Sequence, residues 1–278
     1  MKRIVTLVLV LLAALLAAFT AMRLQQKHAS LQISGNHAQT FGPRLMLWAW
    51  ETSEDLTTLD PHKAGVAFLA REVLLSDHLQ IRPRLQPLQL SPNTYTMAVV
   101  RIETAPNFVP TKTLARQAAV AIAEAQQQTD AQALQVDFDA LASQRAFYAE
   151  ILQALHKHLR PTIPLSITAL MSWCREGNWL NTLPIDEAVP MLFRMGGPAS
   201  TRAVAPRSTA GIDDGPCNTS VGIATDEVWP TIAPTKRVYV FRPGSWTHED
   251  LANINTLGYQ SLEQNRLTSN EAAPTDKP

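Results

Sequence analysis

Eight short apolar runs, spaced along most of the chain, constrain the fold more than any other feature of this sequence. Each run is too short for a typical helix and is apolar on both faces, which is typical of strands buried on both sides of a sheet. We therefore expect eight buried strands, at residues 45–51, 65–70, 96–103, 134–139, 165–171, 188–195, 220–227 and 237–243.

Segments with helical spacing separate several of these runs. The three longest are at residues 111–128, 143–159 and 247–257, and a short helix is expected after residue 173. The first segment has a threonine cap, Thr111 or Thr113, and the second has Ser143 as its expected N-cap. The third begins with the sequence THED, which has the form of a capping box.

Strands that alternate with helices and are apolar on both faces indicate parallel pairing. Eight of them within one domain, residues 43–262, predict a (β/α)₈ barrel of the TIM type with a reduced or irregular set of helices. The runner-up is an open doubly wound sheet. That fold usually carries a Gly-rich phosphate turn after its first strand, and the sequence has none.

The two ends of the chain read as separate from this domain. Lys2 and Arg3 precede a long apolar run, so residues 1–25 are expected to be a signal peptide or an N-terminal membrane anchor. A buried core helix is a poor alternative, because the run is apolar on all sides. Residues 26–42 read as a linker and residues 263–278 as a disordered tail. The positive-inside rule then places the domain outside the cytoplasm.

The two cysteines fit an oxidising compartment. Cys174 and Cys217 are the only ones in the chain, and we expect them to pair. Such a bridge closes a loop of about 44 residues, for about 4 kcal/mol on the chain-entropy model. Two separate buried thiols are the alternative. Two cysteines without a nearby histidine cluster make a poor metal site.

Charge and motifs exclude several classes of function. Lysine plus arginine and aspartate plus glutamate both number 24, and there is no basic block that would bind nucleic acid. The seven histidines show no metal-ligand spacing, and no nucleotide-binding motif is present, so we expect neither a metal nor a cofactor. No feature defines an oligomeric state.

Charged residues gather at the ends of the expected strands, where a barrel of this kind carries its active site. Asp137 and Asp139 are two residues apart, so both point the same way, and the same holds for Arg101 and Glu103. Glu103 and Asp139 lie on adjacent strands and are expected within several ångströms of each other. We predict Asp139, Asp137 and Glu103 as catalytic residues. The alternative is structural: such acids also hold an arginine, cap a helix or bind a structural cation.

Tryptophans supply a second signal. Five of the six fall at or just after expected strand ends: Trp50, Trp173, Trp179, Trp229 and Trp246. Tryptophan faces stack on the apolar faces of sugar rings, although any one of them can simply plug the mouth of the barrel. The predicted substrate-binding residues are Trp50, Glu51, Trp173, Arg194, Asp226 and Trp246.

Three stretches, LQVDFDALASQRAFY, LSITALMSWC and DEAVPMLFRMG, resemble the bacterial proteins grouped as domain of unknown function 3142. The likeness runs from about Leu45 to about Pro243. It implies an exported, barrel-like protein on the outer side of the bacterial inner membrane, either periplasmic or extracellular, and no established reaction.

A more distant likeness is to glycoside hydrolase family 18, whose fourth strand carries the pattern D-x-x-D-x-D-x-E. On this pattern Asp137 and Asp139 match, whereas Leu134 and Leu141 replace the first aspartate and the final glutamate. Because that glutamate is the family's general acid, a proton donor must come from elsewhere: Glu103, Glu51, Asp226 or Glu227.

Three functions follow as hypotheses: a barrel that hydrolyses a glycan, a barrel that only binds one, and a scaffold in the cell envelope. The carboxyl groups discriminate between the first two. Two accessible carboxyls about 5–9.5 Å apart across a cleft fit hydrolysis. An Asp137 and Asp139 pair bonded to Arg101 or Arg242 fits binding or structure.

Overall fold

The computed structural model describes residues 42–175, 179–193, 215–227 and 229–257. The expected leader, the expected tail, all of the expected linker but Gly42, and Arg194 lie outside these ranges. No helix within them is long and apolar enough to cross a membrane.

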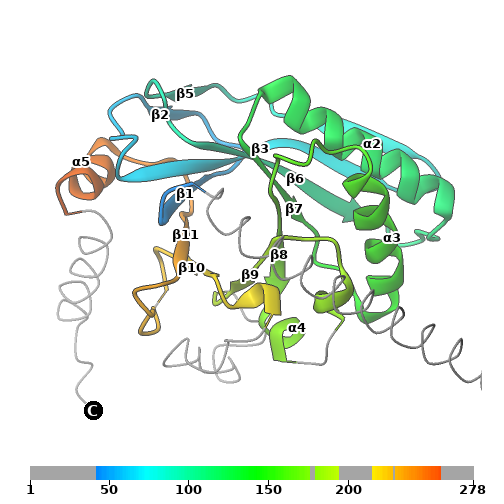
Figure 1. The fold of residues 1–278 in the computed structure, drawn as a ribbon. Helices are drawn as coiled ribbons and strands as arrows, with labels where there is room; N and C mark the ends of the chain where they lie inside the picture. The colour runs from blue at the N-terminus through cyan, green and yellow to red at the C-terminus, as the bar shows by residue number, and fades with distance from the viewer. Residues whose placement is uncertain (1–41, 176–178, 194–214, 228, 258–278) are drawn as a thin grey trace, which may run out of the picture. The chain divides into compact units, whose positions relative to one another are not determined.

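Eight parallel strands close into a barrel, as Figure 1 shows. They follow one another around the barrel in chain order, and the first strand pairs with both the second and the last, which closes the ring. This confirms all eight expected strands and excludes the open sheet. The strands are β1 (Leu45–Ala49), β3 (Ala64–Leu75), β6 (Thr96–Thr104), β7 (Ala133–Asp137), β8 (Leu165–Leu170), β9 (Glu187–Met191), β10 (Ser220–Ala224) and β11 (Arg237–Phe241).

Helices accompany only some of the strands. The described helices are α2 (Lys112–Thr129), α3 (Arg145–His156), α4 (Met171–Arg175) and α5 (His248–Leu257), together with three short 3₁₀ turns. In Figure 1, α2 and α3 lie side by side along β6 and β7. The α5 helix lies on another side, where the amide of Asn255 donates to the carbonyl of Thr58. A regular alternation of strand and helix is therefore only partly present.

The helix ends follow the expected capping chemistry with one exception. The Thr111 hydroxyl accepts the backbone N–H of Leu114, which caps α2. At α5 the Thr247 hydroxyl accepts the N–H of Asp250, and the Asp250 carboxylate accepts the N–H of Thr247. The prediction for Ser143 was wrong. It lies in a 3₁₀ turn and Gln144 is the cap of α3, because that turn precedes the helix.

Three short strands were not expected. Strand β3 runs past the barrel and turns back at Ser76–His78 into the antiparallel edge strand β4 (Leu79–Pro83). The segments β2 (Glu54–Leu56) and β5 (Leu88–Leu90) form a separate two-stranded sheet. Each is short or exposed, so it lacks the apolar run that reveals a buried strand.

A polar layer fills the barrel near the amino-terminal ends of its strands. The Glu187 carboxylate is fully buried, and it accepts hydrogen bonds from Arg237, Tyr239 and Ser166 at 2.8, 2.7 and 3.0 Å. The hydroxyl of Tyr239 also lies 3.7 Å from the sulfur of Met97. Because these side chains come from β6, β8, β9 and β11, they tie several strands together and fill this end of the barrel.

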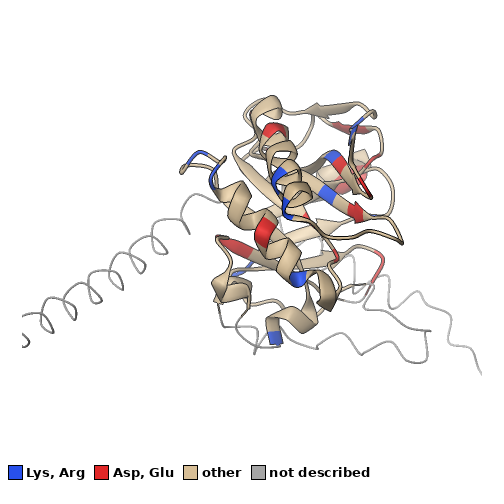
Figure 2. Cartoon of the chain, turned by 90° about the vertical axis from the view of Figure 1, so that its right-hand side faces the viewer, with Lys and Arg blue, Asp and Glu red and all other residues tan. Residues whose placement is uncertain are grey.

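Cys174 and Cys217 form a disulfide, as expected, with their Cα atoms 6.0 Å apart. The bridge links α4, which follows β8, to the turn that precedes β10. Disulfides form and persist outside the cytoplasm, so this one supports a non-cytoplasmic location. Acidic and basic residues intermingle along the elements drawn in Figure 2, in agreement with the balanced charge of the chain.

Candidate functional site

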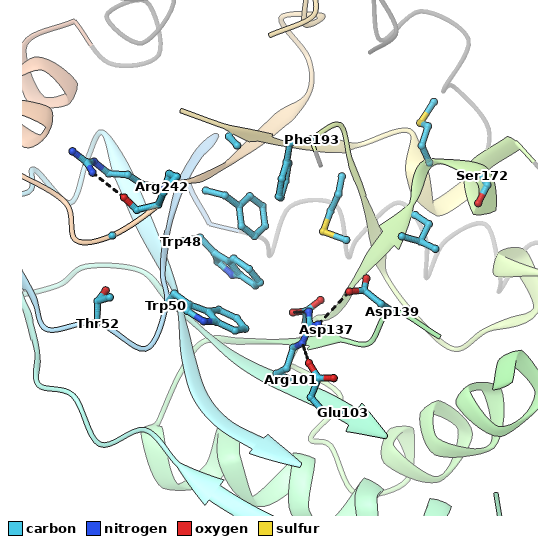
Figure 3. Close-up of a pocket in the computed structure, with 17 residues that line it drawn as sticks. Trp48, Trp50, Thr52, Arg101, Glu103, Asp137, Asp139, Ser172, Phe193 and Arg242 are labelled. Carbon is cyan, nitrogen blue, oxygen red and sulfur yellow. Dashed lines mark hydrogen bonds and ion pairs between the residues drawn. The ribbon is translucent and has the colours of Figure 1, made fainter. Parts of the chain in front are cut away.

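A cavity of about 810 Å³ lies at the carboxyl ends of the strands, where the first residues beyond several strands meet. Figure 3 shows a charged group on one side of it and aromatic side chains on another. The residues that line it are Trp48, Trp50, Thr52, Arg101, Glu103, Asp137, Asp139, Leu170, Met171, Ser172, Met191, Phe193, Ala224, Phe241, Arg242, Pro243 and Gly244.

Arg101 is the centre of the charged side. Its Nε donates to Glu103 at 2.7 Å, its Nη1 to Asp137 at 2.8 Å and its Nη2 to Asp139 at 3.2 Å. Arg101 and Asp137 are register partners on the parallel strands β6 and β7, which places their side chains together. One guanidinium therefore holds all three predicted catalytic carboxylates.

The three carboxylates differ strongly in exposure. The side chain of Asp137 is 1% exposed, whereas those of Asp139 and Glu103 are 46% and 51% exposed. Burial raises the pKa of Asp137, against the opposing effects of Arg101 and of the Thr168 hydroxyl, which donates to its Oδ1 at 2.6 Å. Asp137 thus anchors the group, and the other two carboxylates face the cavity.

The same contacts keep the guanidinium of Arg101 protonated. Burial alone would lower its pKa, but the charge of Asp137 and the hydrogen bonds to Asp137 and Glu103 outweigh it and raise the pKa of the guanidinium. Arg101 is therefore a permanent cation in this site, and its face also lies 5.9 Å from the ring of Trp50.

Aromatic side chains form the other wall, which we call the aromatic wall: Trp50, Trp48, Phe241 and Phe193 in spatial order. Neighbouring ring centroids are 5.2, 3.9 and 4.6 Å apart. Gly222 makes room for the wall, since a Cβ atom there would lie 3.2 Å from the Phe241 ring and 3.5 Å from that of Phe193. The wall is thus a continuous apolar surface that faces the charged group.

Hydrogen bonds, some of them buried, hold the end of β1, where Trp48 lies, and Trp50 directly beyond it. Arg84 donates from its two terminal nitrogens to the carbonyls of Trp50 and Thr52. The indole N–H of Trp246 donates to the carbonyl of Trp48 at 3.1 Å. The buried Glu54 carboxylate accepts the backbone N–H of Trp246 at 2.9 Å. The wall is therefore formed before any ligand arrives.

Four of the predicted site residues line the cavity: Asp137, Asp139, Glu103 and Trp50. The others that the structure describes lie elsewhere. Glu51 accepts the backbone N–H groups of Leu85 and Gln86, at 2.9 and 3.1 Å, and so supports the neighbouring loop. Asp226 is exposed in the turn after β10, and neither it nor Glu51 lines the cavity. Arg194 lies outside the described residues.

The sequence led us to expect that five tryptophans lie together and stack on sugar rings. The structure does not bring these five together. Trp173 is buried in the hydrophobic core, packed between Tyr148 and Trp179 at centroid distances of 6.3 and 5.3 Å. Trp246 and Trp229 are buried too, and neither lines the cavity. Of the five, only Trp50 reaches the cavity, because the others lie beyond their strands and fold back over the core.

The predicted site residues did not include Arg101, the centre of the charged side, or three members of the aromatic wall. These three are Trp48, Phe193 and Phe241. All four were visible as a period-two pattern. Each lies two residues from another inward residue in its strand or directly beyond it, as Trp48 does from Trp50 and Arg101 from Glu103. Within the described residues, no group of three or more histidines, cysteines or acids could hold a metal ion.

The fold and site define a closed parallel eight-stranded barrel protein with a ligand-sized cavity at the carboxyl ends of its strands. The model of the family described as domain of unknown function (DUF3142) matches residues 93–199. This match confirms the resemblance over the segment from just before β6 to just beyond β9, which includes Arg101 and all three carboxylates. No match to a curated protein was found. The distant likeness to glycoside hydrolase family 18 stays a prediction.

Proposed function

We propose that this protein is an exported barrel whose mouth binds a glycan. The observation that carries the proposal is the cavity of about 810 Å³, with the aromatic wall on one side and the Arg101 carboxylate group on another. Its size falls in the range of small-molecule sites, roughly 300–1,000 Å³.

The two walls match the two faces of a sugar. The axial C–H groups of a pyranose ring make an apolar face, which packs well against indole and phenyl rings. The hydroxyl groups at its edge donate hydrogen bonds, and the exposed carboxylates of Asp139 and Glu103 accept them. The hydrogen bonds to the backbone carbonyls of Trp48 and Trp50 fix the aromatic wall in advance, which lowers the entropy cost of binding.

Hydrolysis of that glycan is the second candidate, with Asp139, Asp137 and Glu103 as its residues. One observation favours it: the pKa of Asp137 is raised by burial and its side chain borders the cavity, so this carboxyl has an increased tendency to hold a proton. Binding without hydrolysis ranks first, because Asp137 and Asp139 are both bonded to Arg101 and Asp137 is buried. Leu141, where a chitinase has its acid, is exposed and does not line the cavity.

The setting of this activity belongs to the same proposal. Residues 1–25 serve as an export signal or a membrane anchor, and the domain works on the periplasmic or extracellular side of the bacterial inner membrane. The disulfide supports this location. The barrel is a reduced member of the TIM type, in which ligands bind at the carboxyl ends of the strands.

A glycan array that covers α- and β-linked neutral, amino and acidic oligosaccharides tests the proposal on the full-length protein in detergent. We expect binding to at least one glycan, and its loss in Trp50→Ala. Release of shorter products from the bound glycan, abolished in Asp139→Asn and in Glu103→Gln, would establish hydrolysis. Binding without any product would leave recognition as the function, and no binding to any glycan would overturn the proposal.

A further inference from the structure

Among the residues that the structure describes, the charges that border the cavity do not cancel. Asp137, Asp139 and Glu103 are three acids, and among the described residues Arg101 is the one cation paired with them. The other cation at the rim, Arg242, is bonded through Nε to Asp250 at 2.9 Å, outside this group. Among the described residues, the charged side of the cavity therefore holds three acids around one arginine, which leaves a surplus of negative charge even when Asp137 keeps a proton.

Part of that negative charge faces the cavity and is not bonded by any described residue. Asp139 and Glu103 each use one oxygen toward Arg101, Oδ2 and Oε1 respectively. In the part of the chain that the structure describes, no donor bonds Oδ1 of Asp139 or Oε2 of Glu103. Both side chains are about half exposed and line the cavity. Two acceptor oxygens with negative charge are thus available to a ligand.

The aromatic wall favours the same sign of charge. Aromatic faces attract cations through their negative quadrupole, most strongly in tryptophan. The aromatic wall, with its two tryptophans, therefore attracts a cationic group on the ligand.

Arg101 does not favour an acidic ligand in return. Its Nε, Nη1 and Nη2 nitrogens each already donate to a carboxylate, and its remaining N–H groups lie on those same two terminal nitrogens. A uronic acid or a sulfated sugar would bring a further negative charge beside three carboxylates, and juxtaposed like charges disfavour binding.

We propose that the glycan bound at this mouth carries protonated primary amino groups, as a de-N-acetylated hexosamine does. An ammonium has three N–H donors and no acceptor, which matches acceptor-only carboxylates. An acetamido or hydroxyl group at the same carbon lacks the charge. The inference rests on the proposed function and names the substrate class of the same site.

Isothermal titration calorimetry of the full-length protein in detergent tests this with three β-1,4-linked hexamers, of glucosamine, N-acetylglucosamine and glucose. At pH 6 we expect the glucosamine hexamer to bind at least tenfold more tightly than the other two, with an affinity that falls as salt is added. In the Asp139→Asn, Glu103→Gln double variant the preference should fall below twofold. Glu249→Gln, which removes an exposed carboxylate on α5, is the matched control and should keep the preference.

The outcomes separate this inference from the proposed function. Equal or tighter binding of the acetylated or neutral hexamer would overturn the inference and leave glycan binding in place. A preference that survives the double variant would also overturn it, because the carboxylates would not be its source. Spermidine is the probe for charge alone. If spermidine binds as tightly as the glucosamine hexamer, the sugar rings contribute nothing to binding, and the inference is overturned. Failure of all three hexamers, together with an empty glycan array, would overturn both.

Discussion

The guanidinium of Arg101 donates a 2.8 Å hydrogen bond to the buried carboxylate of Asp137, its register partner on the neighbouring strand. This contact explains why an apolar strand ends in two aspartates. Asp137 compensates the charge of Arg101 inside the barrel, and Asp139, two residues later, reaches the same guanidinium from the cavity side. The pair fixes the position of the whole charged group.

Breaking this pair is expected to destabilise the fold strongly. Arg101→Met leaves the buried carboxylate of Asp137 without its cation, and removal of one partner of a buried pair costs about 3–5 kcal/mol. Chemical denaturation, monitored by tryptophan fluorescence, measures the loss. A double-mutant cycle with Asp137→Asn should recover a large part of it, since the second change removes the orphaned charge.

The neighbouring pair of Arg101 and Glu103 provides the comparison for that cycle. The Glu103 side chain is about half exposed, and exposed ion pairs contribute only about 0.2–1 kcal/mol. We therefore expect a coupling energy several times smaller than for Arg101 and Asp137. Equal coupling in the two cycles would mean that burial of Asp137 is not what makes its pair important.

The aromatic wall is expected to contribute strongly to binding. Trp50→Ala removes the ring nearest to Arg101 and should weaken the binding of any glycan found for this site by about tenfold or more, because central tryptophans dominate interface energies. Trp179→Ala is the control, since that ring packs against Trp173 away from the cavity. Similar losses in both variants, measured by calorimetry, would speak against a role of the wall.

A pH dependence is expected from Glu54. Burial raises the pKa of this carboxyl above its ordinary value of 4.5, against hydrogen bonds from Thr52 and Trp246. The folded state then binds the proton more tightly than the unfolded state does. The stabilising contribution is complete below pH 4.5 and is lost as the pH rises through the folded pKa.

Glu54→Gln tests this, because glutamine mimics the protonated acid. The wild type loses stability relative to the variant as the pH rises. The free energy of unfolding of the variant minus that of the wild type should therefore increase between pH 4 and pH 7. Glu249→Gln controls for the loss of one surface carboxylate. A difference for Glu54→Gln that stays constant, or that moves the other way, would show that the pKa of Glu54 is not raised.

The disulfide is expected to stabilise the barrel near its mouth. Cys174→Ser with Cys217→Ser should lower the free energy of unfolding by about 4 kcal/mol on the chain-entropy model, because the bridge closes a long loop. The same loss should follow when a reductant is added to the wild type, and the reductant should leave the double variant unchanged. A reductant that acts equally on both proteins would contradict this origin.

The barrel could be predicted from the sequence because its strands are buried on both faces. Each such strand is a continuous apolar run, and all eight runs matched a strand of the ring. The strands β2, β4 and β5 escaped because exposure leaves no such run. The Asp137, Asp139 and Glu103 group was predicted for a related reason: period two places alternate residues on one side of a strand.

The rest of the site depended on what happens beyond the strands. Trp50 lies one residue beyond β1, whereas Trp173 lies three residues beyond β8 and Trp246 five beyond β11. The latter two turn back into the core, and no local pattern records that turn. The role of Glu51 in holding the Leu85 and Gln86 amides depends on a contact across more than thirty residues of chain. The central role of Arg101 depends on the strand register, which sets Arg101 beside Asp137.

The most direct test of glycan binding at the barrel mouth is a crystal structure of the protein soaked with the β-1,4-linked glucosamine hexamer. We predict density for sugar rings against Trp48 and Trp50, with an amino group within hydrogen-bond distance of Asp139 or Glu103. Sugar density at another surface, with the mouth free of it at saturating hexamer, would contradict the assignment of this cavity as the binding site.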